Sequence, residues 1–168
     1  MKKLVFIFLF ALTVLNVHAQ TKVGIIDADY ILAQMPEIKT VDDGLKTYNT
    51  ELQEELQNTV KKYEELIKDY QATNSTLPED QKIAKENEII TMENDIQNYR
   101  QKASVLMQLR RNELTKPLYE KIDVAMRQVI TEQNYTQIIN ANANSLAYSD
   151  PKFDITDAVL AKMGITVQ

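Results

Sequence analysis

Two long segments with a helical apolar repeat constrain this chain most, and they occupy the stretch from Thr40 to about Asn134. In the first segment, apolar residues recur at intervals of three or four that average about 3.6, so they share one helical face. An extra interval of four separates this pattern from a strict heptad and predicts a nearly straight pair of helices. The stripe consists of Leu45, Tyr48, Leu52, Leu56, Val60, Tyr63, Ile67 and Tyr70. Because polar residues fill the other positions, the pattern indicates a two-helix hairpin in solvent.

The hairpin arm is predicted over residues 40–114, with its tip near residues 74–78, where small polar residues break the repeat. Pro78 fits the first turn of a returning helix, because its missing N–H has no partner to lose there. We assign the apolar residues of the returning helix to the stripe that faces the first helix. These residues are Ile83, Ile89, Ile90, Met92, Ile96, Tyr99, Ala103, Leu106 and Leu109.

Two capping boxes mark the predicted helix starts. Thr40 with Asp43 opens the first helix, and Thr76 with Glu79 opens the second. Gly44 lies one turn inside the first helix. It is either a hinge at the base of the arm or a glycine that the helix tolerates at a cost of about 1 kcal/mol relative to alanine.

The remaining residues, 20–39 and 115–168, are expected to form a β-rich association body. A buried strand is predicted at 22–27, and a β-hairpin at 136–140 and 145–149. A final helix begins near Asp154 and ends at Gly164. The candidate association strands contain Val23, Ile25, Ile26, Ile138, Ile139, Leu146 and Tyr148.

The expected fold class is therefore α+β, with a small β-barrel body and a long antiparallel helical hairpin. Three short strands cannot close a barrel, and their open edges invite pairing with other strands. Three copies of the chain would supply about nine strands, which is enough for closure. The residues themselves thus predict association through the body.

Residues 1–19 have the pattern of a cleavable secretory signal, with two lysines, a short apolar run and small residues before a cut between Ala19 and Gln20. The run is short for a bilayer span, and the alternative is an uncleaved anchor.

Cleavage removes two of the 19 basic residues and leaves 24 acidic ones, a net charge of −7. Such an acidic surface makes nucleic acid an unfavourable partner, because nucleic-acid affinity rests on neutralising phosphates. No stable membrane insertion is expected after cleavage.

The residue types of the mature chain exclude most catalytic chemistry. His18 leaves with the signal, and there is no cysteine, so nucleophilic triads and the usual zinc sites cannot form. Three scattered glycines cannot form a phosphate-binding loop. Adjacent carboxylates such as Glu54 and Glu55 diverge by about 100° on a helix, so they do not meet at one point. We therefore expect no enzyme activity, cofactor, metal site or catalytic residue.

Both ends of the mature chain resemble a known family. The segment from Tyr135 to Tyr148, followed by Asp154 to Leu160, is similar to the C-terminal signature of the Skp/OmpH family of periplasmic chaperones. Val23 to Asp27 and Met35 to Lys39 resemble its first strand and the following loop. The resemblance implies a homotrimer in the periplasm whose helical tentacles surround a cavity. It also implies ATP-independent capture of unfolded outer-membrane proteins. The best-known members are strongly basic and this chain is acidic, so no ligand residue is carried over from them.

The candidate client contacts are tyrosine and methionine side chains on the arm, which suit promiscuous binding. They are Tyr63, Tyr70, Met92, Tyr99 and Met107. The same residues could instead hold the two helices together. An alternative function also stays open, in which the hairpin is a structural or adaptor coiled coil of the envelope that binds one defined partner.

Overall fold

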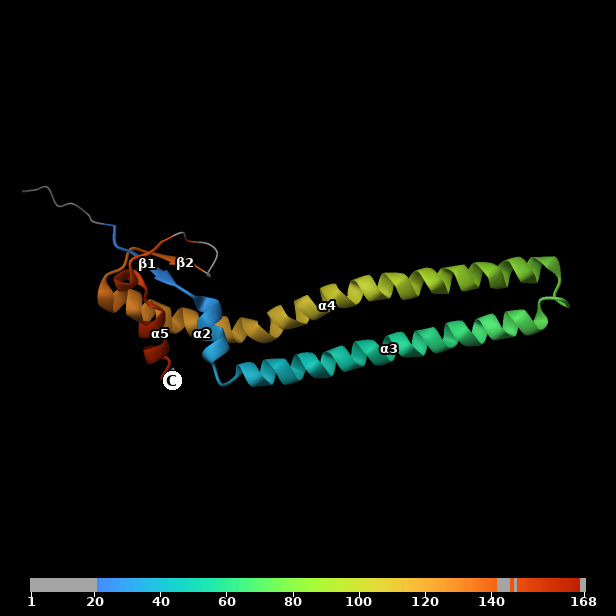
Figure 1. Cartoon of the computed structure of the whole chain (residues 1–168), viewed down its shortest axis with the longest axis horizontal. Helices are drawn as coiled ribbons and strands as arrows, with labels where there is room; N and C mark the ends of the chain where they lie inside the picture. Colours follow the sequence, from blue (N-terminus) through green and yellow to red (C-terminus); the bar gives the residue numbers. More distant parts are fainter. Residues whose placement is uncertain (1–20, 142–145, 147, 167–168) are drawn as a thin grey trace, which may run out of the picture. The chain divides into compact units, whose positions relative to one another are not determined.

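The computed structural model describes residues 21–141, 146 and 148–166 of the chain. The predicted signal, with its cut between Ala19 and Gln20, lies outside these residues. Figure 1 shows the elements in chain order. They are β1 (Val23–Ile26), α2 (Ala28–Gln34), α3 (Ile38–Thr73), α4 (Glu79–Gln133), β2 (Gln137–Asn140), the short 3-10 helix η2 (Pro151–Phe153) and α5 (Thr156–Lys162).

The chain divides into two compact units. Among the described residues, the body unit comprises 21–31, 122–141, 146 and 148–166, and the arm unit comprises residues 32–121. The predicted arm, 40–114, lies within the arm unit.

The body unit contains a parallel two-stranded sheet. β1 pairs with β2 in a register that sets Ile25 opposite Ile139. On the other side of β1, an isolated parallel bridge joins Ile25 to Asp154, and the Ile155 N–H donates to the Ile25 carbonyl at 2.8 Å. β1 is therefore the middle of three extended segments, and both of its edges are occupied.

This arrangement corrects the predicted β-hairpin. β2 pairs with the distant β1, and Leu146 and Tyr148 lie outside both strands. Of the predicted link, 141–144, all but residue 141 falls outside the described residues. Because Asp154 occupies the free edge of β1, a strand at 145–149 could pair only with the outer edge of β2. A single chain thus has two strands in its described part, and the closed barrel stays a prediction.

The core of the body unit combines the inner face of β1 with three helical segments. Its buried side chains come from β1, the start of α2, the last turns of α4 and α5, and Ile31 and Val159 are fully buried. Asp27 caps α2, because its carboxylate accepts from the Tyr30 N–H at 2.8 Å. Gly164, with a φ of 71°, ends α5 as predicted. Gly164 therefore occupies the left-handed conformation that glycine adopts most easily.

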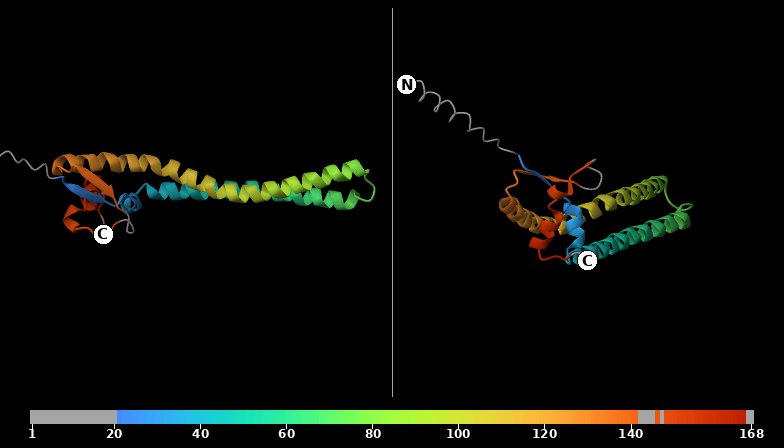
Figure 2. Two further views of the ribbon diagram at one scale, coloured as in Figure 1. Left: turned by 90° about the horizontal axis from the view of Figure 1, so that it is seen from above. Right: turned by 60° about the vertical axis from the view of Figure 1, so that its left-hand side comes forward.

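The arm unit is an antiparallel pair, α3 and α4, which run side by side in both views of Figure 2. The first stripe predicted from the sequence is buried or half-buried throughout, and Leu52 is its most enclosed member. The helices approach closely at Gly44, where an added Cβ would lie 3.2 Å from Leu114 Cδ1. α4 continues through Pro117 without ending.

The predicted N-cap of α3, Thr40, is wrong by three residues. α3 begins at Ile38, and its N-cap Glu37 makes no side-chain capping bond. The turn at Pro36 already places Glu37 in helical backbone geometry, so the helix starts before Thr40 can act as a cap. The Glu37 carboxylate instead accepts from Lys121 at 2.9 Å, and this bond lowers the pKa of Glu37.

Candidate functional site

Two tyrosines of the predicted client-contact set join the helices of the arm. The Tyr99 hydroxyl donates to the Glu55 carboxylate at 2.7 Å. The pKa of Tyr99 is raised to about 12, mainly by desolvation in the arm and secondly by this hydrogen bond. Tyr70 donates in the same way to Glu86, which raises the pKa of Tyr70. The hydroxyl groups of both tyrosines are thus engaged within the arm, while their rings are half-buried.

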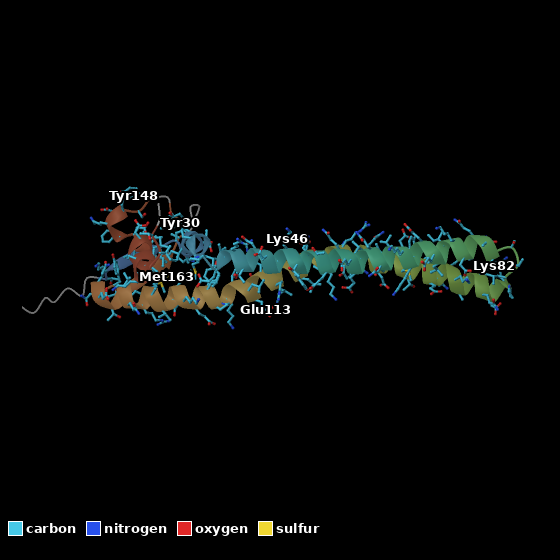
Figure 3. All side chains as sticks on the ribbon, turned by 90° about the horizontal axis from the view of Figure 1, so that it is seen from below. Tyr30, Lys46, Lys82, Glu113, Tyr148 and Met163 are labelled. Carbon is cyan, nitrogen blue, oxygen red and sulfur yellow. The ribbon has the colours of Figure 1, made fainter. Side chains whose placement is uncertain are left out.

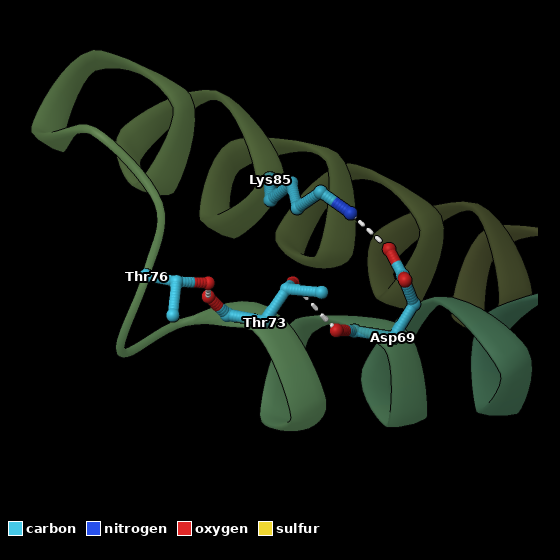
Figure 4. Close-up of polar contacts among 4 residues, drawn as sticks. All are labelled: Asp69, Thr73, Thr76 and Lys85. Carbon is cyan, nitrogen blue, oxygen red and sulfur yellow. Dashed lines mark hydrogen bonds and ion pairs between the residues drawn. The ribbon is translucent and has the colours of Figure 1, made fainter.

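The tip is held by polar contacts that Figure 4 shows in close-up. Lys85 of α4 pairs with Asp69 of α3. The Thr73 hydroxyl donates to the Asp69 carbonyl at 2.7 Å, and the Thr76 hydroxyl donates to the Thr73 carbonyl at 2.9 Å. Thr76 therefore satisfies a carbonyl at the end of α3. The sequence had predicted that the Thr76 side chain would instead cap the start of α4.

The other three predicted contacts, Tyr63, Met92 and Met107, are also half-buried. All five candidates belong to the faces that α3 and α4 turn toward each other. They contribute to the seam, and part of each side chain still reaches solvent.

A second face of α4 carries apolar residues that sequence reasoning assigned wrongly to the seam. Ile83 and Ile90 are 51% and 55% exposed, and Leu109 is 59% exposed. Val105 lies on the same outer face and is 59% exposed. The seam is instead formed by the row that includes the buried Ile96. α4 has two interleaved rows with apolar residues at intervals of three and four. The prediction from the sequence assigned residues of both rows to the seam.

The outer row forms a face that we call the neutral stripe. It contains Ile83, Ile90 and Val105, and its spacing of three or four keeps it on one side of the helix. Its six other positions, all exposed, are Asn87, Asn94, Asn98, Gln101, Gln108 and Asn112. The sequence signal that reveals it is the absence of charge at every position of one row. Charged side chains such as Lys46 and Glu113 lie elsewhere on the arm (Figure 3).

Carboxylates border the distal half of the neutral stripe, from Ile83 to Asn98. Glu86 precedes Ile90 by four residues and Glu93 follows it by three, so both are its neighbours on one side. Asp80, three residues before Ile83, lies on the other side, as does Asp95 beside Asn98.

Most of this negative charge is not neutralised within the arm. Lys82 pairs with Glu79 and Lys85 pairs with Asp69. In the described part of the chain, no ion pair involves Asp80, Glu93 or Asp95. The distal arm therefore presents an apolar and amide face between free carboxylates.

The body unit has its own apolar surface, on the outer face of the sheet. Ile25 and Ile139 lie opposite each other on this face, and Ile139 is 38% exposed. Next to them, Tyr148 is 83% exposed. A groove of about 300 Å³ opens there. It is lined by Thr21, Lys22, Val23, Ile25, Ile139, Tyr148, Ser149, Asp150 and Phe153.

Few charges enter this groove, and those that do are paired. Lys152 and Asp150 form an ion pair at 2.6 Å, and the pKa of Asp150 is lowered by this bond and by the Lys152 N–H. Lys22 lies 4.0 Å above the Tyr135 ring and donates to the Gln133 carbonyl at 2.7 Å. Five predicted association residues, Val23, Ile25, Ile26, Ile138 and Ile139, lie in the sheet. The groove is thus an apolar surface with satisfied polar edges.

Among the described residues, no three or more acidic, histidine or cysteine side chains gather to hold a metal ion. No helix in the same ranges is both long and apolar enough to cross a membrane.

A family model for outer membrane proteins of the OmpH-like type matches residues 22–163, which include both strands, the whole arm and all of α5. The chain belongs to the OmpH-like family. This membership confirms the resemblance that the two ends of the sequence carry.

Individual relatives agree with the family assignment. The OmpH-like chain is 27% identical over 149 residues to the "Chaperone protein Skp" of Yersinia enterocolitica, covering 84% of this chain and 85% of that protein. Its fold is similar to the crystal structure of an OmpH-like outer membrane chaperone from Caulobacter crescentus, with a TM-score of 0.61 and 21% identity. That match covers 89% of both chains. These findings support a chaperone role for the OmpH-like chain.

Proposed function

We propose that this OmpH-like chain is an ATP-independent holdase of the periplasm that captures unfolded outer-membrane β-barrel proteins between helical arms. Family membership is the observation that carries the proposal. The arm suits it physically, since a slender hairpin exposes side chains along its whole length. Capture would rest on many weak contacts, which include the half-buried Tyr63, Tyr70, Met92, Tyr99 and Met107.

The working form in this proposal is a homotrimer joined through the body unit. The support is the unpaired outer edge of β2 in the described residues, together with the apolar groove beside Ile139 and Phe153. A sheet with an open edge and an apolar outer face gains by pairing with further strands. Leu146 and Tyr148, both exposed, are placed to contribute to that contact.

The function is tested by diluting a urea-unfolded outer-membrane protein into buffer with the mature chain and no nucleotide. The proposal expects the client to stay in solution, as measured by light scattering. Aggregation at the same rate as in buffer alone would refute it. An envelope adaptor that binds one defined partner would also leave the client to aggregate, so the assay separates the two functions.

The trimer is tested by the mass of the mature chain in solution. We expect three times the chain mass, and a smaller species for Ile139→Asp or Phe153→Asp, because a buried carboxylate would oppose association. Val124→Asp is the matched control, since Val124 is 59% exposed in the body unit but does not line the groove. A single-chain mass for the unmodified protein would contradict the trimer.

A further inference from the structure

We propose that the distal half of the neutral stripe, Ile83 to Asn98, binds extended polypeptide segments that carry aliphatic side chains together with lysine or arginine. The inference rests on the proposed holdase function and names the class of segment that the arm selects. Three features of this face carry it: exposed isoleucines, a row of amides and a border of free carboxylates.

The isoleucines supply the apolar part of the contact. Ile83 and Ile90 are both more than half exposed, because they lie on the side of α4 that α3 does not cover. Covering these side chains removes apolar surface from water, which favours binding without fixing a sequence. An aliphatic partner side chain is therefore part of the recognised chemistry.

The amides supply contacts to the partner backbone. Asn87, Asn94 and Asn98 lie in the same row and are exposed. A side-chain amide both donates and accepts hydrogen bonds, so it can pair with the N–H and C=O groups of any unfolded chain. From Ile83 to Asn98 the row is about 22 Å long, which matches about seven residues of extended polypeptide.

The carboxylates supply the charge preference. From Glu64 to Arg100 the arm has nine acidic and four basic residues. Two of those four basic residues, Lys82 and Lys85, are already paired. The charges of Glu93, Asp80 and Asp95 therefore remain available to a cationic partner, and they repel an acidic one. The same charges disfavour phosphate-bearing partners such as nucleic acids and anionic lipids.

The test uses two peptides of equal length and equal aliphatic content, one with lysines and one with glutamates at the charged positions. Fluorescence anisotropy measures their binding to the mature chain at about 0.01 M and about 0.3 M salt. We expect the lysine peptide to bind about tenfold more tightly at low salt, and the difference to shrink at high salt because exposed charges are screened. Equal affinities at low salt would overturn the inference.

Variants locate the contact on the arm. Asp80→Asn/Glu93→Gln/Asp95→Asn should abolish most of the preference for the lysine peptide. A matched triple, Glu51→Gln/Glu54→Gln/Glu88→Gln, removes the same charge from positions off the stripe and should keep most of it. Ile83→Gln/Ile90→Gln should weaken the binding of both peptides several-fold, because both peptides make the apolar contact. Equal losses for the two carboxylate triples would overturn the assignment to this face.

The same samples separate this inference from the proposed function. If the chain keeps an unfolded outer-membrane protein in solution but shows no charge preference, the inference fails and the holdase stands. If it binds neither peptide and no unfolded client, both fail. A change of solution mass in Ile83→Gln/Ile90→Gln with unchanged peptide affinity would show that the stripe packs against another copy, and would also overturn the inference.

Discussion

The Tyr99 hydroxyl lies 2.7 Å from the Glu55 carboxylate and 3.4 Å from the Leu52 carbonyl, so one phenol of α4 contacts two acceptors on α3. Near the tip, Tyr70 makes the corresponding contact in the opposite direction, from α3 to Glu86 of α4. The two tyrosines thus join the helices of a hairpin that has little apolar area to bury.

Replacing Tyr99 by phenylalanine keeps the ring and removes the bond to Glu55. We expect the free energy of unfolding to fall by about 0.5–1.5 kcal/mol, the usual net value of one hydrogen bond. Urea unfolding followed by circular dichroism measures the change. Tyr148→Phe is the control and should have no effect, since Tyr148 is 83% exposed. An unchanged stability for Tyr99→Phe would show that water replaces the bond fully.

The raised pKa of Tyr99 predicts a loss of stability at alkaline pH. Its folded value of about 12 exceeds the ordinary 10.0, so the fold favours the neutral phenol. The resulting stabilisation is fully present below pH 10.0 and is lost as the pH rises through about 12. The stability difference between the unmodified chain and Tyr99→Phe should therefore shrink across this range. A difference that stays constant would refute the assigned shift.

Two glycine-to-alanine changes should have different effects. At Gly24, an added Cβ would lie 2.8 Å from both Ile138 Cδ1 and Tyr135 Cε1, and the Tyr135 ring is buried. We expect a loss of about 1–3 kcal/mol from this overpacking. At Gly44 the nearest atom is 3.2 Å away, at the flexible end of Leu114. A gain of about 1 kcal/mol in helix propensity should offset that contact.

Thermal unfolding of the two alanine variants measures these effects. A lower midpoint for Gly24→Ala together with an almost unchanged one for Gly44→Ala is the expected result. Equal losses would contradict the geometry at Gly24. Gly44→Ala also tests whether that glycine is needed as a hinge. If it is, the variant should keep less unfolded client in solution although its stability is unchanged.

Thr156 links the two ends of the chain within the body unit. Its buried hydroxyl accepts from the Asp27 N–H at 3.0 Å. Thr156→Val keeps the shape and leaves that N–H without a partner, so we expect a loss of about 1–3 kcal/mol. Thr91→Val is the control, because the Thr91 hydroxyl is exposed and bonds only within its own helix. Urea unfolding of both variants measures the difference, and equal stabilities would refute the role of Thr156.

The sequence by itself determined the local elements. The apolar period fixed the helical hairpin and its tip before Pro78, because a face repeated at intervals of three and four can only be buried by a helix. Gly164 marked the end of the last helix through its own chemistry, as a residue free to adopt positive φ.

Only the tertiary structure decided which partners these elements meet. The strand 137–140 was predictable, but its parallel pairing with β1 depends on the long connection through α2, α3 and α4, which no local pattern encodes. In α4, Ile90 and Ile96 both fit a helical repeat, yet one is 55% exposed and the other is buried. Periodicity defines the rows of a helix, while the position of α3 selects which row it covers. The neutral stripe is the row that α3 leaves uncovered.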